Sequence, residues 1–559
     1  MVEAVRSSYY GRGGVCMTSK MGWLAAAALM VLTAAPASGQ DGARLVDAAA
    51  DQDWVAVRAL LAEGVDADGA RADGVTALVY AAHWDDLDAV GVLLRAGANV
   101  DAADDHGVTA LARACENASP GMVERLLDAG ADPNAAQTSG LTPLMTAVET
   151  GNAEVVRLLL ASGADVNAAT AETHNTALMW AVAGRRADIV HRLIEHGAAL
   201  DVSTAKGFTL LMIAARHGDI EMARTLLAAG ADINAAGADG AHVLPYAIVI
   251  GQAEFAHFLL EEGADPNAKV SGVTALHAAT GHMAFWLAEW NQKHGAASRG
   301  RGLAESQRLP LVEALLARGA DPNARITDSA VFEEYLGYPR RGAFDTYTSG
   351  VGDLRGATPL WIASMGANGK PIFGIAIPTG CGGAGCQGGA ESVEVMRLLL
   401  AAGADPTLAT DDGTTPLMAA AGLGRYTNDK NLRRGKRSPS SEAAVTLLLD
   451  AGAAVDARNE ADFTALHGAA FRGLNEVIRI LVDHGADIDA RDFRGRTPYR
   501  LAEGSKQSFY FQEFPETAAL LEALGADTSL GLAATVQERL RDVSVADADA
   551  EAGAGQQQQ

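Results

Sequence analysis

The stretch that decides the fold is GLTPLMTAVETGNAEVVRLLLASGADVN, residues 140–167. Thr142 before Pro143 predicts the start of a helix, because a threonine hydroxyl caps free backbone N–H groups and proline at the first helical position gives up no needed donor. This helix should end at Gly151 after about two turns. A second helix should then stop at Gly163, since glycine accepts the left-handed conformation just beyond a helix C-terminus.

Both predicted helices carry an apolar stripe on one face, which is typical of helices packed against a core. The apolar side chains of the pair are Leu144, Ala147, Val148, Val155, Val156, Leu158, Leu159 and Leu160. Asp165 and Asn167 then supply the turn chemistry for a short hairpin leading to the next unit. Two short helices cannot bury such stripes alone, so this stretch predicts stacked neighbours of the same kind.

The same phrase recurs from Ala43 to Asp527. Its stop glycines Gly97, Gly130, Gly163, Gly197, Gly230 and Gly263 are spaced 33, 33, 34, 33 and 33 residues. This period, with Thr-Pro-Leu and Gly-Ala-Asp, resembles the ankyrin repeat family. Further units stop at Gly64, Gly319, Gly403, Gly452, Gly485 and Gly525. The resemblance implies an all-α solenoid of about twelve helix-turn-helix units joined by short hairpin-like turns.

The amino-terminal residues 1–39 resemble a secretory signal peptide. An apolar run, Met21 to Ala35, follows Arg6, Arg12 and Lys20 and precedes small residues. We therefore expect export to a periplasmic or extracellular location, cleavage between Ala37 and Gln40, and no transmembrane segment after cleavage. The alanine-rich composition favours a bacterial source.

The chain is acidic, with a formal net charge of −25 that becomes −27 without residues 1–39, where 41 basic residues face 68 acidic ones. Nucleic acid is excluded as a partner, because binding it requires a basic face that neutralises phosphates.

Beyond residues 1–39, the expected organisation has three parts. Residues 42–267 should hold the amino-terminal cap and regular repeats, and residues 268–529 should hold repeats with insertions at 281–309, 325–355, 367–390 and 424–440. Residues 530–559 should form a closing helix, followed by a disordered acidic and glutamine-rich tail.

The resemblance also implies where a partner binds. In this family the hairpin tips and first helices line the concave face, and partners usually lie there. Carried over by position, the candidate contacts in the repeats are His83, Trp84, Glu116, Asn117, Glu149, Arg216, His217, Phe471 and Arg472. Trp84 is suited either to contact a partner or to pack against a neighbouring repeat.

Three of the four insertions fall at the helix-to-helix turn of successive repeats, so stacking should bring them to one edge. Their aromatic content exceeds that of a polar linker and adds the candidates Trp286, Trp290, Tyr335 and Tyr338. Two interpretations remain open: the insertions bind a partner, or they fold back and cover one another. The same aromatic residues also suit stacking on sugar rings, an alternative function as a carbohydrate or cell-wall binding module.

Catalytic chemistry is not indicated. The run Gly380–Gly385 matches G-x-G-x-x-G but lacks a β-α-β context, and the histidines show no spacing typical of a metal site. Cys381 and Cys386 lie in that glycine-rich run and are either a disulfide or free thiols, whereas Cys115 occupies a small buried position. We therefore predict a non-catalytic scaffold, without cofactor or metal, that binds another protein. An enzyme with its site under the 367–390 loop is the remaining alternative.

Overall fold

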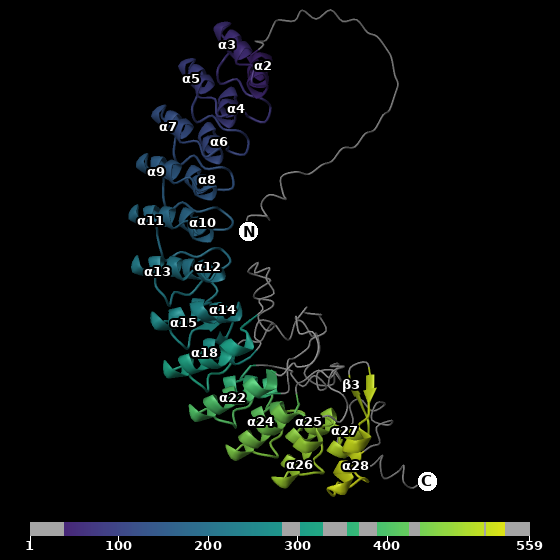
Figure 1. Cartoon of the computed structure of the whole chain (residues 1–559). Helices are drawn as coiled ribbons and strands as arrows, with labels where there is room; N and C mark the ends of the chain where they lie inside the picture. Colours follow the sequence, from purple (N-terminus) through teal and green to yellow (C-terminus); the bar gives the residue numbers. More distant parts are fainter. Residues whose placement is uncertain are drawn as a thin grey trace, which may run out of the picture.

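The computed structural model describes residues 38–281, 302–327, 355–367, 388–423, 437–507 and 510–531. Figure 1 shows a gently curved array in which first helices such as α4, α6 and α8 form one column and second helices such as α5, α7 and α9 form the other. The column of first helices lies on the concave side. This arrangement confirms the expected all-α solenoid.

The twelve helix pairs follow one another along the chain. In the first seven units they are α2 (Ser38–Ala50) with α3 (Trp54–Ala62), α4 (Ala77–His83) with α5 (Leu87–Arg95), α6 (Ala110–Glu116) with α7 (Pro120–Asp128), α8 (Pro143–Thr150) with α9 (Ala153–Ala161), α10 (Ala177–Ala183) with α11 (Ala187–Glu195), α12 (Leu210–Arg216) with α13 (Ile220–Ala228), and α14 (Val243–Val249) with α15 (Ala253–Glu261). In the last five they are α16 (Ala275–Thr280) with α18 (Glu305–Ala317), α21 (Pro359–Ala367) with α22 (Gly388–Ala401), α23 (Pro416–Ala420) with α24 (Pro439–Asp450), α25 (Ala465–Arg472) with α26 (Asn475–Asp483), and α27 (Pro498–Glu503) with α28 (Pro515–Ala523).

The deciding stretch folds as its residues predict. The Thr142 hydroxyl accepts the backbone N–H of Met145 at 3.2 Å, and α8 ends at Gly151, whose φ is 80°. Gly163 follows α9 with a φ of 85°. Most of the predicted stripe is buried, but Leu158 is only partly so.

Sheet structure is short in the described chain. Strands β1 (Lys269–Val270) and β2 (Val273–Thr274) pair antiparallel, with Lys269 opposite Thr274. Strands β3 (Ser505–Gln507) and β4 (Tyr510–Gln512) pair in the same sense, with Ser505 opposite Gln512. Four other hairpins are reduced to single bridges, such as that between Ala70 and Thr76.

Consecutive units are joined by a ladder of side-chain hydrogen bonds. In nine cases the backbone N–H two residues after a stop glycine donates to a side-chain oxygen of the preceding unit, at 2.6–2.9 Å. The donors and acceptors are Asn99 with Asp68, Asp132 with Asp101, Asp165 with Asn134, Ala199 with Asn167, Asp265 with Asn234, Asp321 with Asn267, Asp405 with Asn323, Asp487 with Asp456, and Asp527 with Asp489. We call this set the turn ladder.

The helix pairs stack on both sides of the insertions. The helices that follow two of the insertions begin earlier in the sequence than predicted. Helix α18 begins at Glu305, inside the predicted insertion 281–309, and α22 begins at Gly388. The ends of the insertion 325–355 are held together because the Ile326 N–H donates to the Ala357 carbonyl at 3.0 Å and the Gly356 N–H donates to the Ile326 carbonyl at 2.8 Å.

Several predicted features lie outside the described residues. These are the signal segment up to residue 37, Trp286, Trp290, Tyr335, Tyr338, Cys381, Cys386, and everything after Gly531 in the predicted closing helix and tail. Cys115 is buried as predicted, and burial raises the pKa of its thiol.

Two histidines bind hairpins from inside the stack. The Nδ1 of His277 lies 2.7 Å from the Thr274 hydroxyl oxygen, and its Nε2 lies 3.0 Å from the carbonyl oxygen of Ala357. His467 makes the same pair of contacts with the Thr464 hydroxyl at 2.9 Å and the Arg496 carbonyl at 3.1 Å. A carbonyl only accepts, so Nε2 carries the proton and Nδ1 accepts from the hydroxyl. Both rings are therefore neutral donors and acceptors.

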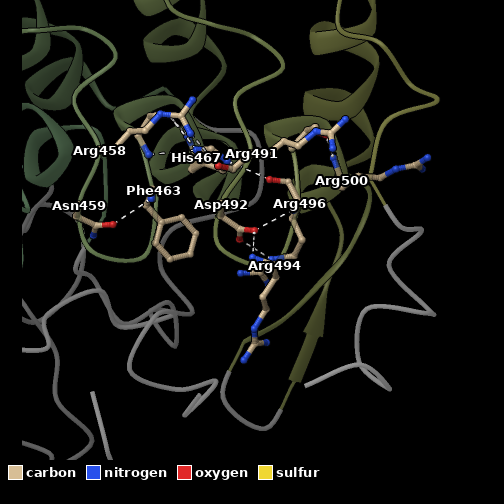
Figure 2. Close-up of polar contacts among 11 residues, drawn as sticks. Arg458, Asn459, Phe463, His467, Arg491, Asp492, Arg494, Arg496 and Arg500 are labelled. Atoms are coloured by element: carbon tan, nitrogen blue, oxygen red, sulfur yellow. Dashed lines mark hydrogen bonds and ion pairs between the residues drawn. The ribbon is translucent and has the colours of Figure 1, made fainter. Parts of the chain in front are cut away.

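The hairpin between α26 and α27 contains a buried ion pair, drawn in Figure 2. Arg496 Nε donates to Asp492 Oδ2 at 2.7 Å, and the exposed side-chain fractions are 6% and 0%. Asp492 Oδ1 also accepts the backbone N–H groups of Arg494 and Arg496, each at 2.9 Å. The carboxylate thus compensates a buried guanidinium and closes the hairpin.

Gly163→Val should lower the free energy of unfolding by about 1–2 kcal/mol, because a β-branched residue resists a φ of 85°. No heavy atom lies within 4 Å of a Cβ placed there, so the cost comes from the backbone alone. Denaturation midpoints and amide hydrogen exchange across α9 measure it. Gly121→Ala, at a glycine in α7 without a positive φ, is the control and should not destabilise; equal midpoints for Gly163→Val and the parent would contradict the assignment.

Acidification from pH 7 to pH 5 should destabilise the protein through His277. Burial lowers its pKa to about 4, so the folded state keeps the ring neutral while the unfolded state takes up a proton below about 6.5. The stabilisation that neutral His277 contributes is fully present above pH 6.5. Below that pH, the free energy of unfolding falls by about 1.4 kcal/mol per pH unit until the pKa of the folded state is reached. The denaturation midpoint should change less with pH in His277→Gln than in the parent. In His106→Gln, at an exposed hairpin residue, it should change with pH as in the parent. A parallel slope for His277→Gln and parent would refute this role.

Asp492→Asn should cost about 3–5 kcal/mol, because it leaves the Arg496 guanidinium buried without its charge partner while retaining an oxygen for the backbone. Hydrogen exchange in α27 and α28 should accelerate. Asp487→Asn is the matched control: its pair with Arg458 at 3.7 Å is largely exposed, so a loss under about 1 kcal/mol is expected. Equal exchange in both variants would show that burial of the first pair is not important.

Candidate binding edge

The turns between first and second helices form one continuous edge of the solenoid. Each described turn of the first seven units contains a residue with positive φ, which reverses the chain within four residues. These residues are Gln52, Asp85, Ala118, Gly151, Arg185, Gly218 and Gly251. Since the turn recurs in each of these seven units, we call this surface the turn edge.

Seven predicted partner contacts lie on the turn edge and are exposed: His83, Trp84, Glu116, Asn117, Glu149, Arg216 and His217. The Trp84 side chain is 41% exposed, and its ring meets that of His83 edge-on at 4.8 Å. Trp84 is therefore accessible on the surface of the described chain, although more than half of it is covered.

Phe471 and Arg472 require a correction. They were predicted at the same position of a later unit, but they are 8% and 9% exposed. The stem of Arg472 lies over Gly422 of the preceding unit, so close that a Cβ on Gly422 would be 2.9 Å from its Cγ. The absence of a side chain at Gly422 lets the later residue turn inward.

Some turn-edge residues already serve the stack. The Asn117 side-chain amide donates to the carbonyls of Ala82 and His83 at 3.0 and 2.8 Å. Asn152 donates in the same way to Ala118 at 2.9 Å. These bonds fix each turn on its predecessor, so the turn edge is a rigid surface rather than a set of independent loops.

Charge changes sign along the turn edge. The first two turns carry Asp51, Asp53, Asp85 and Asp86, whereas the fifth and sixth carry Arg185, Arg186 and Arg216. Arg185 donates to Asp219 at 2.8 Å. Partial burial of the ring, followed by the nearby Arg216 and Arg185, lowers the pKa of His217.

Three of the four insertions begin and end on the same edge. Their described ends are Gly281 and Gly302, Ala367 and Gly388, and Leu423 and Arg437, each between the first and second helices of a unit. Close packing links these ends: a Cβ on Gly366 would lie 2.7 Å from the Ser392 hydroxyl, and one on Gly389 would meet Ser440 of the next unit. Residues next to the insertions are thus parts of the stacked core.

Sequence reasoning missed two exposed residues at the amino-terminal end of this edge, Val55 and Leu87. Each follows an N-cap aspartate by one or two positions, where the pattern predicts only the start of a second helix. The signal that would have indicated Val55 is an apolar residue at a position where most of the next units have an exposed Asp or Glu. For Leu87 it is a leucine at a position where the next units have Pro120, Ala153 and Ala187.

The described residues offer no constellation for metal chemistry, since no group of three or more His, Cys, Asp or Glu side chains there could hold an ion. Across the same ranges, no helix combines the length and apolarity needed to cross a bilayer.

Comparison with known proteins identifies the repeat. A family model of ankyrin repeats, three copies long, matches residues 45–137, 103–170, 144–237, 211–297, 386–492 and 436–509, which together span more than half of the chain. Similar curated proteins include alpha-latroinsectotoxin-Lt1a of Latrodectus tredecimguttatus, 32% identical over 22% of this chain and 8% of that protein. The E3 ubiquitin-protein ligase KEG of Arabidopsis thaliana is 33% identical over 20% and 6%. Ankyrin repeat and SOCS box protein 16 of Homo sapiens is 36% identical over 20% and 21%.

The chain spans at most 21% of the length of these three relatives, and the three names describe different activities. The similarity is therefore to their repeats and not to any one activity. Ankyrin repeats generally act as protein–protein interaction modules. With the family model, the stop-glycine period and the stacked helix pairs in agreement, the chain belongs to the ankyrin repeat family.

Proposed function

We propose that this protein is an exported, non-catalytic scaffold that binds a partner protein through its concave face, turn edge and insertions. The observation that carries the proposal is the turn edge itself. It presents Trp84, Arg216 and His217 to solvent, and the insertions of three consecutive units begin on it. A partner lying along this edge would reach the regular repeats and the insertions together.

The rigidity of the edge supports binding without catalysis. Side chains such as Asn117 and Asn152 hold each turn on the preceding one, so little conformational entropy is lost when a partner docks. Export is proposed from the apolar run Met21 to Ala35 and its basic approach.

A quantitative crosslinking pull-down from the exported fraction of the native host tests the function. The full chain should enrich a protein over bare resin. Capture should fall about tenfold when Arg216→Ala and His217→Ala are combined, or when residues 282–301 and 368–387 are replaced by Gly-Ser linkers. The control combines Glu124→Gln and Glu195→Gln, which lie on the second helices α7 and α11, and should leave capture unchanged.

Three results would oppose parts of the proposal. Absence of any enriched protein would contradict the scaffold function, and enrichment of polysaccharide instead would favour the carbohydrate alternative. Recovery of the intact chain from the cytoplasm, with residues 1–37 still present by mass spectrometry, would contradict export.

A further inference from the structure

The exposed large apolar side chains of the described residues are concentrated at one place. Val55, Trp84 and Leu87 are 75%, 41% and 47% exposed, and all three lie at the helix-to-helix turns of the first two units. At the Leu87 position the next units have Pro120, Ala153, Ala187 and Ile220, and at the Trp84 position they have Asn117, Thr150 and Gly184. The apolar cluster is thus a property of this end of the solenoid and not of the repeat.

These side chains lie on two successive turns that have the same geometry. Gln52 and Asp85 have φ values of 58° and 57°. Asp53 and Asp86 cap the second helices in the same way. Each carboxylate accepts the backbone N–H of the residue three positions later, at 2.9 and 2.8 Å. Helices α3 and α5 follow one another at one end of the outer column in Figure 1. Val55 therefore stacks beside the turn that carries Trp84 and Leu87.

The cluster is surrounded by carboxylates. Asp51, Asp53, Asp85, Asp86 and Asp88 lie at the same two turns, and none of them forms an ion pair with a described residue. Residues 45–104 contain twelve Asp and Glu against three Arg, a net charge of −9. We call these five carboxylates, with Val55, Trp84 and Leu87, the amino-terminal patch.

Elsewhere on the turn edge, two acidic side chains form ion pairs within the protein. Glu116 is paired with Arg113 at 2.7 Å, and Asp219 is paired with Arg185 at 2.8 Å. The five carboxylates of the amino-terminal patch instead form no ion pair with a described cation, although two of them cap helices, and they surround exposed apolar surface. Solubility alone does not explain that combination, since exposed apolar side chains oppose it.

We propose that the amino-terminal patch binds a cationic amphipathic segment of a partner protein, one that presents leucine-like side chains flanked by lysine or arginine. The apolar side chains of such a segment would cover Val55, Trp84 and Leu87, and its cations would pair with the carboxylates and lie against the Trp84 ring. Phosphate-bearing or acidic ligands are repelled by the same five aspartates. This inference rests on the proposed function and names the chemistry of the partner.

The test uses fluorescence anisotropy with the full chain and a fluorescein-labelled helical peptide of Leu, Ala and Lys, with leucines and lysines on opposite faces. Binding should be saturable and should weaken about tenfold between roughly 50 and 300 mM NaCl. A peptide with Glu in place of Lys should not bind. Binding of both peptides with equal affinity would overturn the proposal.

Two variants separate the apolar and charged contributions. Trp84→Ala with Leu87→Ser should weaken binding about tenfold. Asp51→Asn with Asp85→Asn and Asp88→Asn should also weaken it and should reduce the salt dependence. The matched control removes three exposed carboxylates from second helices, Glu124→Gln, Glu195→Gln and Glu261→Gln, and should bind within about twofold of the parent.

Equal weakening by both triple variants would mean that only net charge attracts the peptide and would overturn the proposal. Unchanged binding in the Trp84 and Leu87 variant would do the same. All substituted side chains are exposed, and thermal melts of each variant check the fold. If the patch variants still capture the native partner in the pull-down, this inference fails while the scaffold function stands; if the parent captures no protein, the scaffold function fails.

Discussion

The structure depends on contact between successive units, and the turn ladder is its most regular polar form. A buried apolar stripe draws two units together but does not fix their register, since apolar contacts are not directional. A side-chain oxygen that accepts one particular N–H of the next unit does fix it. The Asn134 side chain makes two such bonds to the next unit: its oxygen accepts the Asp165 N–H at 2.6 Å, and its amide donates to the Gly163 carbonyl at 3.1 Å. The small rotation that accumulates as curvature is therefore set at each step.

The sequence determines the local devices well and the exposed surface poorly. Thr142, Gly151 and Gly163 act through their own backbone neighbours, so their roles could be read without a structure. The surface depends on residues far away in sequence. Arg472 lies over Gly422 of the preceding unit, which has no side chain to hold it away, and no pattern within one unit indicates that. Val55 and Leu87 were missed because a helix start considered within one unit does not show whether a neighbour covers it; only comparison with the same position in other units indicates them.

The buried polar groups follow the same division. Thr464 and His467 lie three residues apart at the start of one helix, so their contact is local in the sequence. The ion pair of Asp492 and Arg496 was not singled out, because the repeat places an Asp, Asn or Thr at this hairpin position in many units. Asp104 and Asn459 accept two backbone N–H groups there just as Asp492 does. Only the arginine four residues later converts an ordinary turn into a buried salt bridge, and its burial is a property of the packed end of the solenoid.

The bonds that cross the insertions have a mechanical consequence. Asn267 meets Gly319 and Asp321, Asn323 meets Gly403 and Asp405, and His277 meets Ala357, although up to 82 residues separate the partners. Tension applied along the solenoid is therefore carried from unit to unit by these contacts, and the backbone of the insertions does not need to carry it. Because the entropy of closing a loop grows only slowly with its length, the insertions can lengthen or shorten over evolutionary time with little effect on the stability of the stacked repeats.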